Sequence, residues 1–282
     1  MNETKVFPIH ISNFKLDGGA MFGVVPKSIW QRYYPADEKN LCNWALRSLL
    51  VDNGEQRILI DNGCGDKQNE KFFSFLQLNG GDGLEGGLNK HGYNPEDITD
   101  MVLTHLHFDH CGGGVKRSKN GNGFELTFPN ATYWVSRRQW EWAMNPNKRE
   151  KDSYLEENLL PMMDSGRLKF IEEEGELFPG FEIRIFNGHT EGQVIPIVSY
   201  KDKKLVYSAD LCPSTVHIPA HYNMSFDVRP LISMNEKEEF MQEAYENGYI
   251  LFFEHDLYHE CSTLEKTKRG IRAGKTLLVA EL

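Results

Sequence analysis

Three histidines and an aspartate within six residues constrain this chain more than any other feature of its sequence. The motif His-Leu-His-Phe-Asp-His occupies residues 105–110 and follows an apolar run, residues 98–103, that has the length of a buried strand. Glycines at positions 112–114 then allow backbone to approach backbone closely. Neutral imidazole and ionised carboxylate are ligands that Zn²⁺ and its first-row neighbours accept. The sequence therefore predicts a metal site at the end of a strand.

Three further candidate ligands stand in the same local setting, each just after a strand-like run. They are His189 after residues 181–186, Asp210 after residues 204–209, and His255 after residues 249–254. Side chains at strand ends are held by a rigid sheet, which favours a well-defined site. We therefore expect four strand ends to converge on one metal-binding centre.

This ordered set resembles the metallo-β-lactamase superfamily of metallohydrolases, and the resemblance extends from Asp61 to Asp256. In the dinuclear members, it places one metal on His105, His107 and His189, and the second on Asp109, His110 and His255. Asp210 falls where the family has a carboxylate that bridges both ions. Asp61 matches an early aspartate that orients ligands without binding metal itself. An ordinary turn residue at a strand end is the alternative interpretation of Asp61.

The ligand set excludes two branches of this superfamily. Flavodiiron members carry a glutamate at the position of His107, and the β-lactamases proper have a cysteine where Asp210 stands. The resemblance thus implies the dinuclear hydrolases, which include glyoxalase II, lactonases, phosphotriesterases and nucleases. A formal net charge of −10 argues against a nuclease, because nucleic acid binding requires a basic surface. We expect a small-molecule substrate, with neither nucleic acid nor membrane as a partner.

The resemblance implies an α/β fold, a four-layer αββα sandwich, and strand-like runs separated by helical runs agree with it. The length suits a single domain, residues 1–282, with a sizeable core. Five cysteines without paired spacing do not indicate a disulfide framework. The N-terminus has no apolar signal core and no stretch reaches membrane-spanning length, so we expect a cytoplasmic protein.

Turn and capping signals predict two local elements. Residues 44–51 and 57–60 are expected to form a hairpin around an Asp-Asn-Gly-Glu turn. The sequence Ser-Met-Asn-Glu at residues 233–236 has the pattern of a capping box, which predicts a helix from there through Tyr245 that ends at Gly248.

Two aromatic segments, residues 18–34 and 134–163, are expected to form an apolar wall beside the metals. Residues 18–30 of the first segment, together with the metal motif, resemble the lactonase-like group that includes quorum-quenching acyl-homoserine lactonases and related organophosphate hydrolases. We assign Phe22 and Trp30 to the substrate pocket, with core-covering loops as the alternative. Those lactonases carry a tyrosine three residues after the bridging aspartate, where this chain has Pro213. The residues that could replace this tyrosine are His217, His221 and Tyr222, and we also assign His217 and His221 to the substrate pocket.

The expected activity is hydrolysis of a lactone or small ester by a hydroxide that bridges two divalent metal ions. Two such ions lower the pKa of a shared water to about 7. Zn²⁺ is favoured by the histidines, and Mn²⁺ or Fe²⁺ accept the same ligands. Asp109 is expected to pass a proton to the leaving alkoxide. The alternatives are a non-catalytic metal-binding sensor and a glyoxalase II-like thioesterase, for which the basic residues would be Lys266, Lys268 and Arg269.

Overall fold

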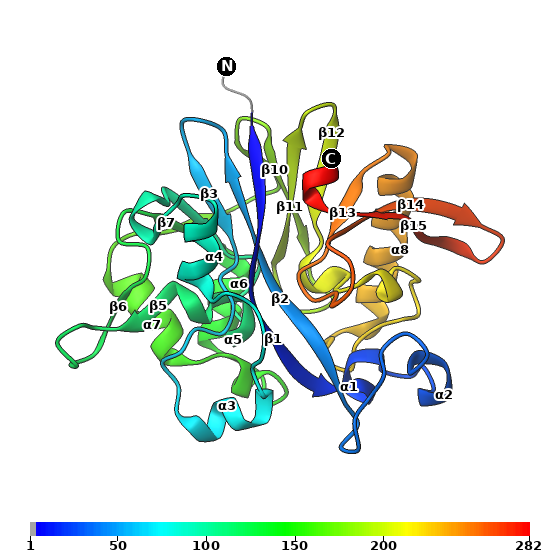
Figure 1. Cartoon of the computed structure of the whole chain (residues 1–282), viewed down its shortest axis with the longest axis horizontal. Coiled ribbons are helices and arrows are strands. Elements are labelled where there is room, and N and C mark those ends of the chain that lie inside the picture. The colour runs from blue at the N-terminus through cyan, green and yellow to red at the C-terminus, as the bar shows by residue number, and fades with distance from the viewer. Residues whose placement is uncertain (1–3) are drawn as a thin grey trace.

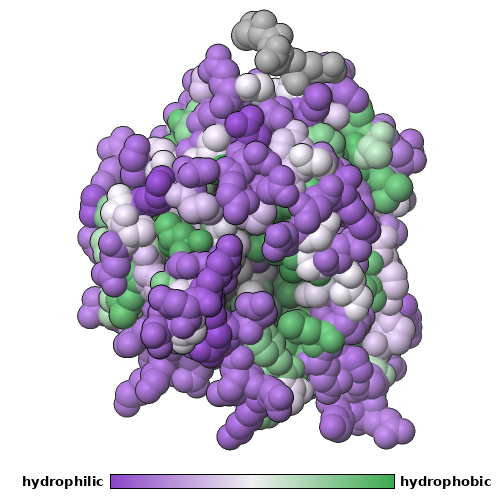
Figure 2. Space-filling model, turned by 60° about the vertical axis from the view of Figure 1, so that its left-hand side comes forward, coloured by the Kyte–Doolittle hydropathy of each residue, from purple (hydrophilic) through white to green (hydrophobic). Residues whose placement is uncertain are grey.

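Two β-sheets pack face to face, with helices on their outer faces, in the computed structural model of this chain (Figure 1). The structure describes residues 4–282. This arrangement is the αββα sandwich expected from the sequence. The part of the surface seen in Figure 2 is mostly hydrophilic, and hydrophobic side chains appear there in small separate patches. Within residues 4–282, no helix is long and apolar enough to cross a membrane.

The first sheet has six strands in the order β1-β2-β3-β4-β7-β8. They are β1 (Lys5–Asp17), β2 (Leu41–Asp52), β3 (Arg57–Ile60), β4 (Asp100–Val102), β7 (Thr132–Ser136) and β8 (Leu168–Ile171). Strands β1, β2 and β3 are antiparallel, and the pairs from β3 to β8 are parallel. The predicted hairpin between β2 and β3 is confirmed, and the Asp52 carboxylate accepts a hydrogen bond from Gly54 N in its turn.

The second sheet has seven strands in the order β15-β14-β13-β12-β11-β10-β9. They are β9 (Gly175–Phe178), β10 (Phe181–Phe186), β11 (Gln193–Tyr200), β12 (Lys203–Tyr207), β13 (Ile250–Phe252), β14 (Cys261–Thr267) and β15 (Gly270–Leu277). Only β12 and β13 pair in parallel in this sheet. A small separate ribbon joins β5 (Val115–Arg117) to β6 (Phe124–Leu126).

Eight α-helices, most of them short, occur among the described residues. They are α1 (Gly18–Phe22), α2 (Lys27–Trp30), α3 (Glu70–Leu76), α4 (Leu84–Lys90), α5 (Phe108–Cys111), α6 (Arg137–Met144), α7 (Glu156–Asp164) and α8 (Pro230–Glu246). The predicted start of α8 is wrong, because the helix begins at Pro230, whose fixed φ suits the first helical position. Ser233 lies inside the helix and is buried against Gly188.

Alternation along the strands separates two hydrophobic clusters. Ile58 and Ile60 of β3 point into the space between the two sheets, whereas Leu59 points to the side covered by helices. On the far side of the second sheet, Phe240 of α8 contacts Phe186 of β10, with ring centroids 5.4 Å apart. The sheets are therefore fixed by packing on both faces, which makes the ends of their strands a rigid platform.

Candidate metal centre

The seven predicted ligands lie together at one end of the two sheets. The motif at residues 105–110 follows β4 and continues into α5, while the other three ligands follow β10, β12 and β13. Their ligand atoms form two groups, each within 4.8 Å: His105, His107, His189 and Asp210 in one, and Asp109, His110 and His255 in the other. The convergence of four strand ends expected from the sequence is what the structure shows.

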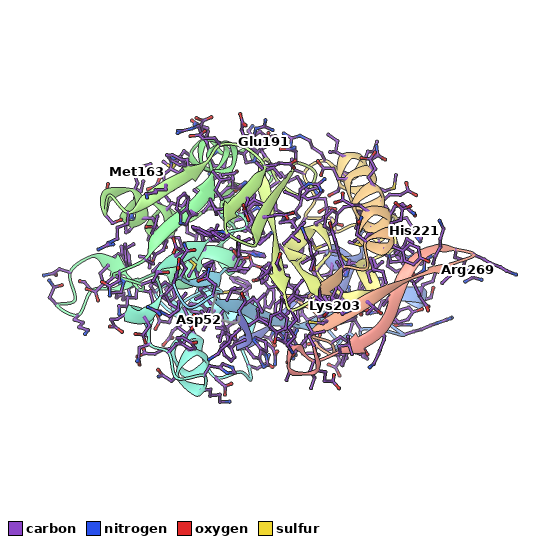
Figure 3. The ribbon with its side chains drawn as sticks, turned by 90° about the horizontal axis from the view of Figure 1, so that it is seen from above. Asp52, Met163, Glu191, Lys203, His221 and Arg269 are labelled. Carbon is purple, nitrogen blue, oxygen red and sulfur yellow. The ribbon has the colours of Figure 1, made fainter. Side chains whose placement is uncertain are left out.

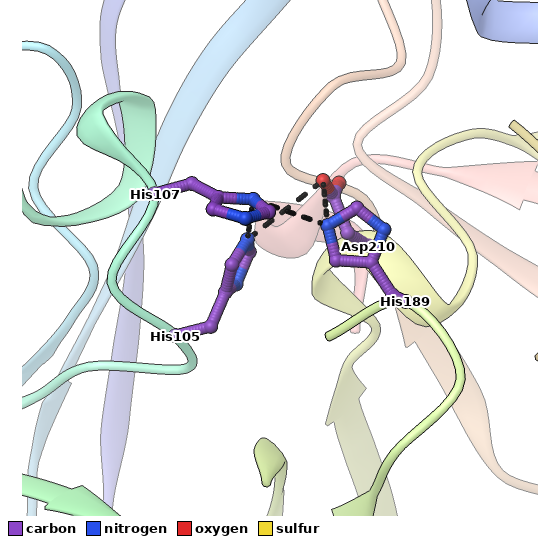
Figure 4. Close-up of side chains that lie close together, drawn as sticks. All are labelled: His105, His107, His189 and Asp210. Atoms are coloured by element: carbon purple, nitrogen blue, oxygen red, sulfur yellow. Dashed lines mark hydrogen bonds and ion pairs between the residues drawn. The ribbon is translucent and has the colours of Figure 1, made fainter. Parts of the chain in front are cut away.

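In the first group, ring nitrogens face one another at the distances of a ligand shell (Figure 4). His107 Nδ1 lies 3.0 Å from His105 Nε2 and 3.3 Å from His189 Nε2. His189 Nε2 also lies 3.2 Å from Asp210 Oδ2. All three rings are buried. Burial holds the pKa of His105 and His107 below the ordinary histidine range, so these rings are neutral and offer lone pairs.

The second group meets the first at Asp210. His110 Nε2 and His255 Nε2 are 3.3 Å apart, and Asp109 Oδ2 lies 3.9 Å from each of them. The other oxygen of Asp210, Oδ1, lies 3.3 Å from His255 Nε2. Asp210 Oδ2 also lies 3.5 Å from His110 Nε2, so this one carboxylate faces both groups, as a bridging ligand would.

The donor geometry fits divalent metal ions. Two ligands at about 2.0–2.1 Å from a tetrahedral ion are about 3.3 Å apart, which matches the separations of 3.0–3.3 Å between neighbouring ring nitrogens. Asp210 Oδ1 is buried and accepts no hydrogen bond. A buried carboxylate oxygen in this state is costly without a positive charge against it, which a metal ion or, in the metal-free protein, the proton on His255 would supply. The residues therefore fit a divalent metal centre.

The second nitrogen of each histidine ring has a partner outside the centre. The pairs are His105 Nδ1 with Thr104 Oγ1 at 3.1 Å, His107 Nε2 with Glu150 Oε1 at 3.3 Å, His110 Nδ1 with Asp61 Oδ2 at 3.0 Å, His189 Nδ1 with Asp227 Oδ1 at 2.9 Å, and His255 Nδ1 with the Ala45 carbonyl at 2.9 Å. Such partners fix the orientation and tautomer of metal-binding histidines.

Asp61 connects the two groups. Its carboxylate contacts His110 Nδ1 and accepts hydrogen bonds from Thr104 N and Thr104 Oγ1, at 2.8 and 2.7 Å, beside His105. Its backbone is left-handed, with φ of 54°, as is that of Ala209 beside Asp210, with φ of 38°. Non-glycine residues adopt this conformation at a cost, and they often do so at functional sites.

Four carboxylates near the centre were not singled out by the sequence. Glu254 Oε2 lies 3.0 Å from His110 Nδ1, the same nitrogen that Asp61 contacts, and burial raises the pKa of Glu254. Asp227 and Glu150 hold the outer nitrogens of two histidines. Glu236 accepts hydrogen bonds from the backbone of the turn before His189, so its place in the capping-box pattern has a different cause. Glu254 could have been found as a buried neighbour of His255, whereas Asp227 and Glu150 come from remote loops and Glu236 comes from α8.

The glycines after the motif bring two loops together, as expected. A Cβ on Gly112 would lie 2.2 Å from the Cys64 carbonyl oxygen, and one on Gly113 would lie 2.1 Å from that of Asn62. No side chain fits at either position. The loop after Asp61 therefore packs directly on the backbone that follows the motif.

A cavity of about 370 Å³ opens beside the centre. Its metal-centre side is formed by His107, Asp109, His189, Asp210 and His255. The apolar part of the wall comes from Leu16, Met21, Phe108, Met224 and Phe226, and the remaining polar residues are Arg149, Glu150, Ser153 and Ser225. The cavity joins an apolar surface to the candidate ligands, which is the usual form of a small-molecule site.

The structure corrects the assignment of the pocket residues. Phe22, Trp30 and His217 are buried in the core, where the Phe22 ring stacks on the other two at 5.3 and 4.8 Å. Neighbouring residues on α1 face different ways, so Met21 reaches the cavity and Phe22 does not. His221 is exposed at another cleft, which it shares with Arg269 (Figure 3). None of these four predicted pocket residues lines the cavity.

The residues proposed to replace the missing tyrosine, or to bind glutathione, also lie elsewhere. Pro213 is buried, and Tyr222 lines the cleft with His221 instead. The basic residues Lys266, Lys268 and Arg269 belong to the hairpin of β14 and β15, away from the cavity wall. All five cysteines lie among the described residues and are buried and free.

Comparisons with known proteins agree with this geometry. The model of the metallo-beta-lactamase superfamily matches residues 47–118. An N-acyl homoserine lactonase of Bacillus thuringiensis is 26% identical over 234 residues, which cover 79% of this chain and 85% of that protein. An N-acyl homoserine lactonase of a Bacillus species is 29% identical over 225 residues, covering 75% and 81%.

Solved structures share the whole fold. A probable metal-dependent hydrolase from Staphylococcus aureus superposes with a TM-score of 0.87 at 28% identity, over 99% of both chains. A dizinc quorum-quenching lactonase in complex with a product superposes with a TM-score of 0.81 at 23% identity, over 99% of this chain and 96% of that one. The fold, the ligand motif and these matches together identify this chain as a metal-dependent hydrolase with the metallo-β-lactamase fold, similar to the N-acyl homoserine lactonases.

Proposed function

We propose that this protein is a dinuclear metal-dependent lactonase that opens acyl-homoserine lactones or closely related lactones and small esters. The observation that carries the proposal is the cavity, which places an apolar wall directly against the candidate ligands. The relatives named N-acyl homoserine lactonase support this substrate class.

We assign the ligands as the sequence suggested. One ion would bind His105, His107 and His189, the other would bind Asp109, His110 and His255, and Asp210 would bind both. The predominance of imidazole favours Zn²⁺. When bound, two divalent ions would activate a water as nucleophile and polarise the ester carbonyl.

Asp109 is the residue best placed to move a proton. Its side chain is 14% exposed, lines the cavity, and at 3.9 Å stands further from the neighbouring ring nitrogens than they stand from each other. A carboxylate in this position can hold the proton of the attacking water and return it to the leaving alkoxide. The apolar wall, with Phe226 and Met224, would bind the acyl chain of the substrate.

A hydrolysis screen of the metal-loaded protein tests this proposal. The substrates are acyl-homoserine lactones, aryl esters, phosphotriesters and S-lactoylglutathione, with metal-stripped protein as the control. We expect the highest kcat/KM on the lactones and no turnover without metal. A higher kcat/KM on S-lactoylglutathione would favour the thioesterase, and metal-loaded protein that hydrolyses none of them would be a binding protein.

A further inference from the structure

His107 is oriented differently from the other four histidines of the centre. His105, His110, His189 and His255 all direct Nε2 toward the ligand groups, whereas His107 directs Nδ1. For Nδ1 to offer a lone pair, the single proton of the neutral ring must be on Nε2. The outer nitrogen of His107 therefore needs an acceptor in a buried place.

Glu150 supplies this acceptor. Its Oε1 lies 3.3 Å from His107 Nε2, and the residue is only 3% exposed. The same oxygen accepts a hydrogen bond from Tyr154 OH at 3.1 Å. The other oxygen accepts from Trp142 Nε1 at 2.7 Å and from Asn147 Nδ2 at 2.5 Å. Because three other side chains donate hydrogen bonds to its two oxygens, the Glu150 carboxylate is held in place as an acceptor for His107.

The same network reaches the segment that carries His189. Tyr154 OH lies 2.8 Å from Thr190 Oγ1, next to His189 in the chain. Gln139 of α6 accepts from Leu106 N at 3.2 Å and donates to Thr190 Oγ1, also at 3.2 Å. The backbone between the first two ligands and the backbone after the third are thus held by one set of buried side chains.

We propose that Glu150 is a positioning residue for the group formed by His105, His107 and His189. It holds the proton of His107 on Nε2, so that Nδ1 is free toward the metal, and Tyr154 extends this control to His189. The inference rests on the proposed metal-binding function. It adds a residue that the ligand motif does not contain. This residue reaches the centre from a loop 43 residues after His107 in the chain.

The test compares metal binding by wild-type protein with that of Glu150→Gln, Tyr154→Phe and Glu243→Gln. Glutamine has the size of glutamate but only one side-chain oxygen, whereas the hydrogen-bond donors around Glu150 use both of its oxygens. Glu243 pairs with Arg184 at 2.8 Å, away from the cavity, and is the matched control. Affinity is measured by chelator competition without any substrate, and the ligand geometry by the visible spectrum of the Co²⁺ form.

We expect Glu150→Gln to bind one of two ions about 10- to 100-fold more weakly and to alter the Co²⁺ spectrum. Tyr154→Phe should give a smaller loss, and Glu243→Gln none. Wild-type affinity for both ions in Glu150→Gln would overturn the inference. Equal weakening of both ions with a lower Tm of the metal-free protein would also overturn it, since that pattern indicates general damage to the fold. Because no substrate is used, a failed lactone screen leaves this result interpretable.

Discussion

At the scale of single residues, the candidate centre depends on carboxylates outside the proposed set of seven ligands. Asp61 accepts three hydrogen bonds from Thr104 and His110 and so connects both groups of ligands. Its left-handed φ of 54° is one that asparagine also tolerates, so the backbone can be kept while the charge is removed.

We therefore expect Asp61→Asn to lose about 10- to 100-fold in kcat/KM or in metal affinity. The side-chain amide nitrogen of the new asparagine would face a hydrogen-bond donor of Thr104 or His110, where an acceptor is needed. This mismatch would rotate the His110 ring or change its tautomer. Asp202→Asn is the control, because the Asp202 side chain is 83% exposed and remote from the cavity. Unchanged metal content and activity in Asp61→Asn would show that Asp61 is an ordinary turn residue.

His255 gives the metal-free protein a distinct pH dependence. Burial alone lowers the pKa of His255, but the carboxylates of Asp210 and Glu254 outweigh burial and raise it to about 9. The proton on His255 therefore stabilises the metal-free fold fully below pH about 6.5, and this contribution is lost as the pH rises through about 9.

The same proton competes with the metal for His255 Nε2. Metal affinity should consequently increase as the pH rises toward about 9 and level off above it, with release of protons on binding below that pH. Calorimetry in buffers of different ionisation enthalpy measures both quantities. An affinity independent of pH, with no protons released, would contradict this account of His255.

At the scale of elements, the phenylalanine in the core and the phenylalanine at the cavity come from different segments of the chain. Phe22 is fully buried between aromatic rings, whereas Phe226, in the loop before α8, is 42% exposed and lines the cavity. Truncation of the two phenylalanines should thus have different consequences, although the sequence suggested a pocket role only for Phe22.

Phe22→Ala should reduce the free energy of unfolding by about 3–5 kcal/mol, because it leaves a cavity in the core. Phe226→Ala should leave stability nearly unchanged and flatten the rise of kcat/KM with acyl length, to which each buried CH₂ adds up to about 0.8 kcal/mol. Denaturant titration and a series of lactones of increasing chain length measure the two effects. A chain-length effect from Phe22→Ala alone would reverse this assignment.

The elements that the sequence predicted well are those with local signals. The strand-like run at residues 181–186 predicted β10, and the Asp-Asn-Gly-Glu turn predicted the hairpin of β2 and β3. The beginning of α8 was misplaced, because Glu236 resembles a capping residue while its carboxylate bonds to the backbone at Asn187 and Gly188. Glu236 lies 49 residues after Asn187 and 48 after Gly188, so no local sequence pattern encodes this contact.

At the scale of the whole molecule, the convergence of the candidate ligands could be predicted from the sequence and their surroundings could not. The ligands follow strands, so their convergence comes from the parallel and antiparallel order of the two sheets. The cavity wall instead combines Leu16 at the end of β1, Phe108 in the motif and Met224 in a late loop. Only the folded chain brings these together, which is why an aromatic-rich segment was mistaken for the wall.

Metal stoichiometry tests the central claim, two ions held by one set of seven side chains, most directly. Elemental analysis of protein saturated with Zn²⁺ and freed of excess metal should give two ions per chain. Asp210→Ala should retain at most one, because the carboxylate that faces both groups is removed. A wild-type protein that saturates at one ion, or an Asp210→Ala variant that still binds two, would contradict the dinuclear centre.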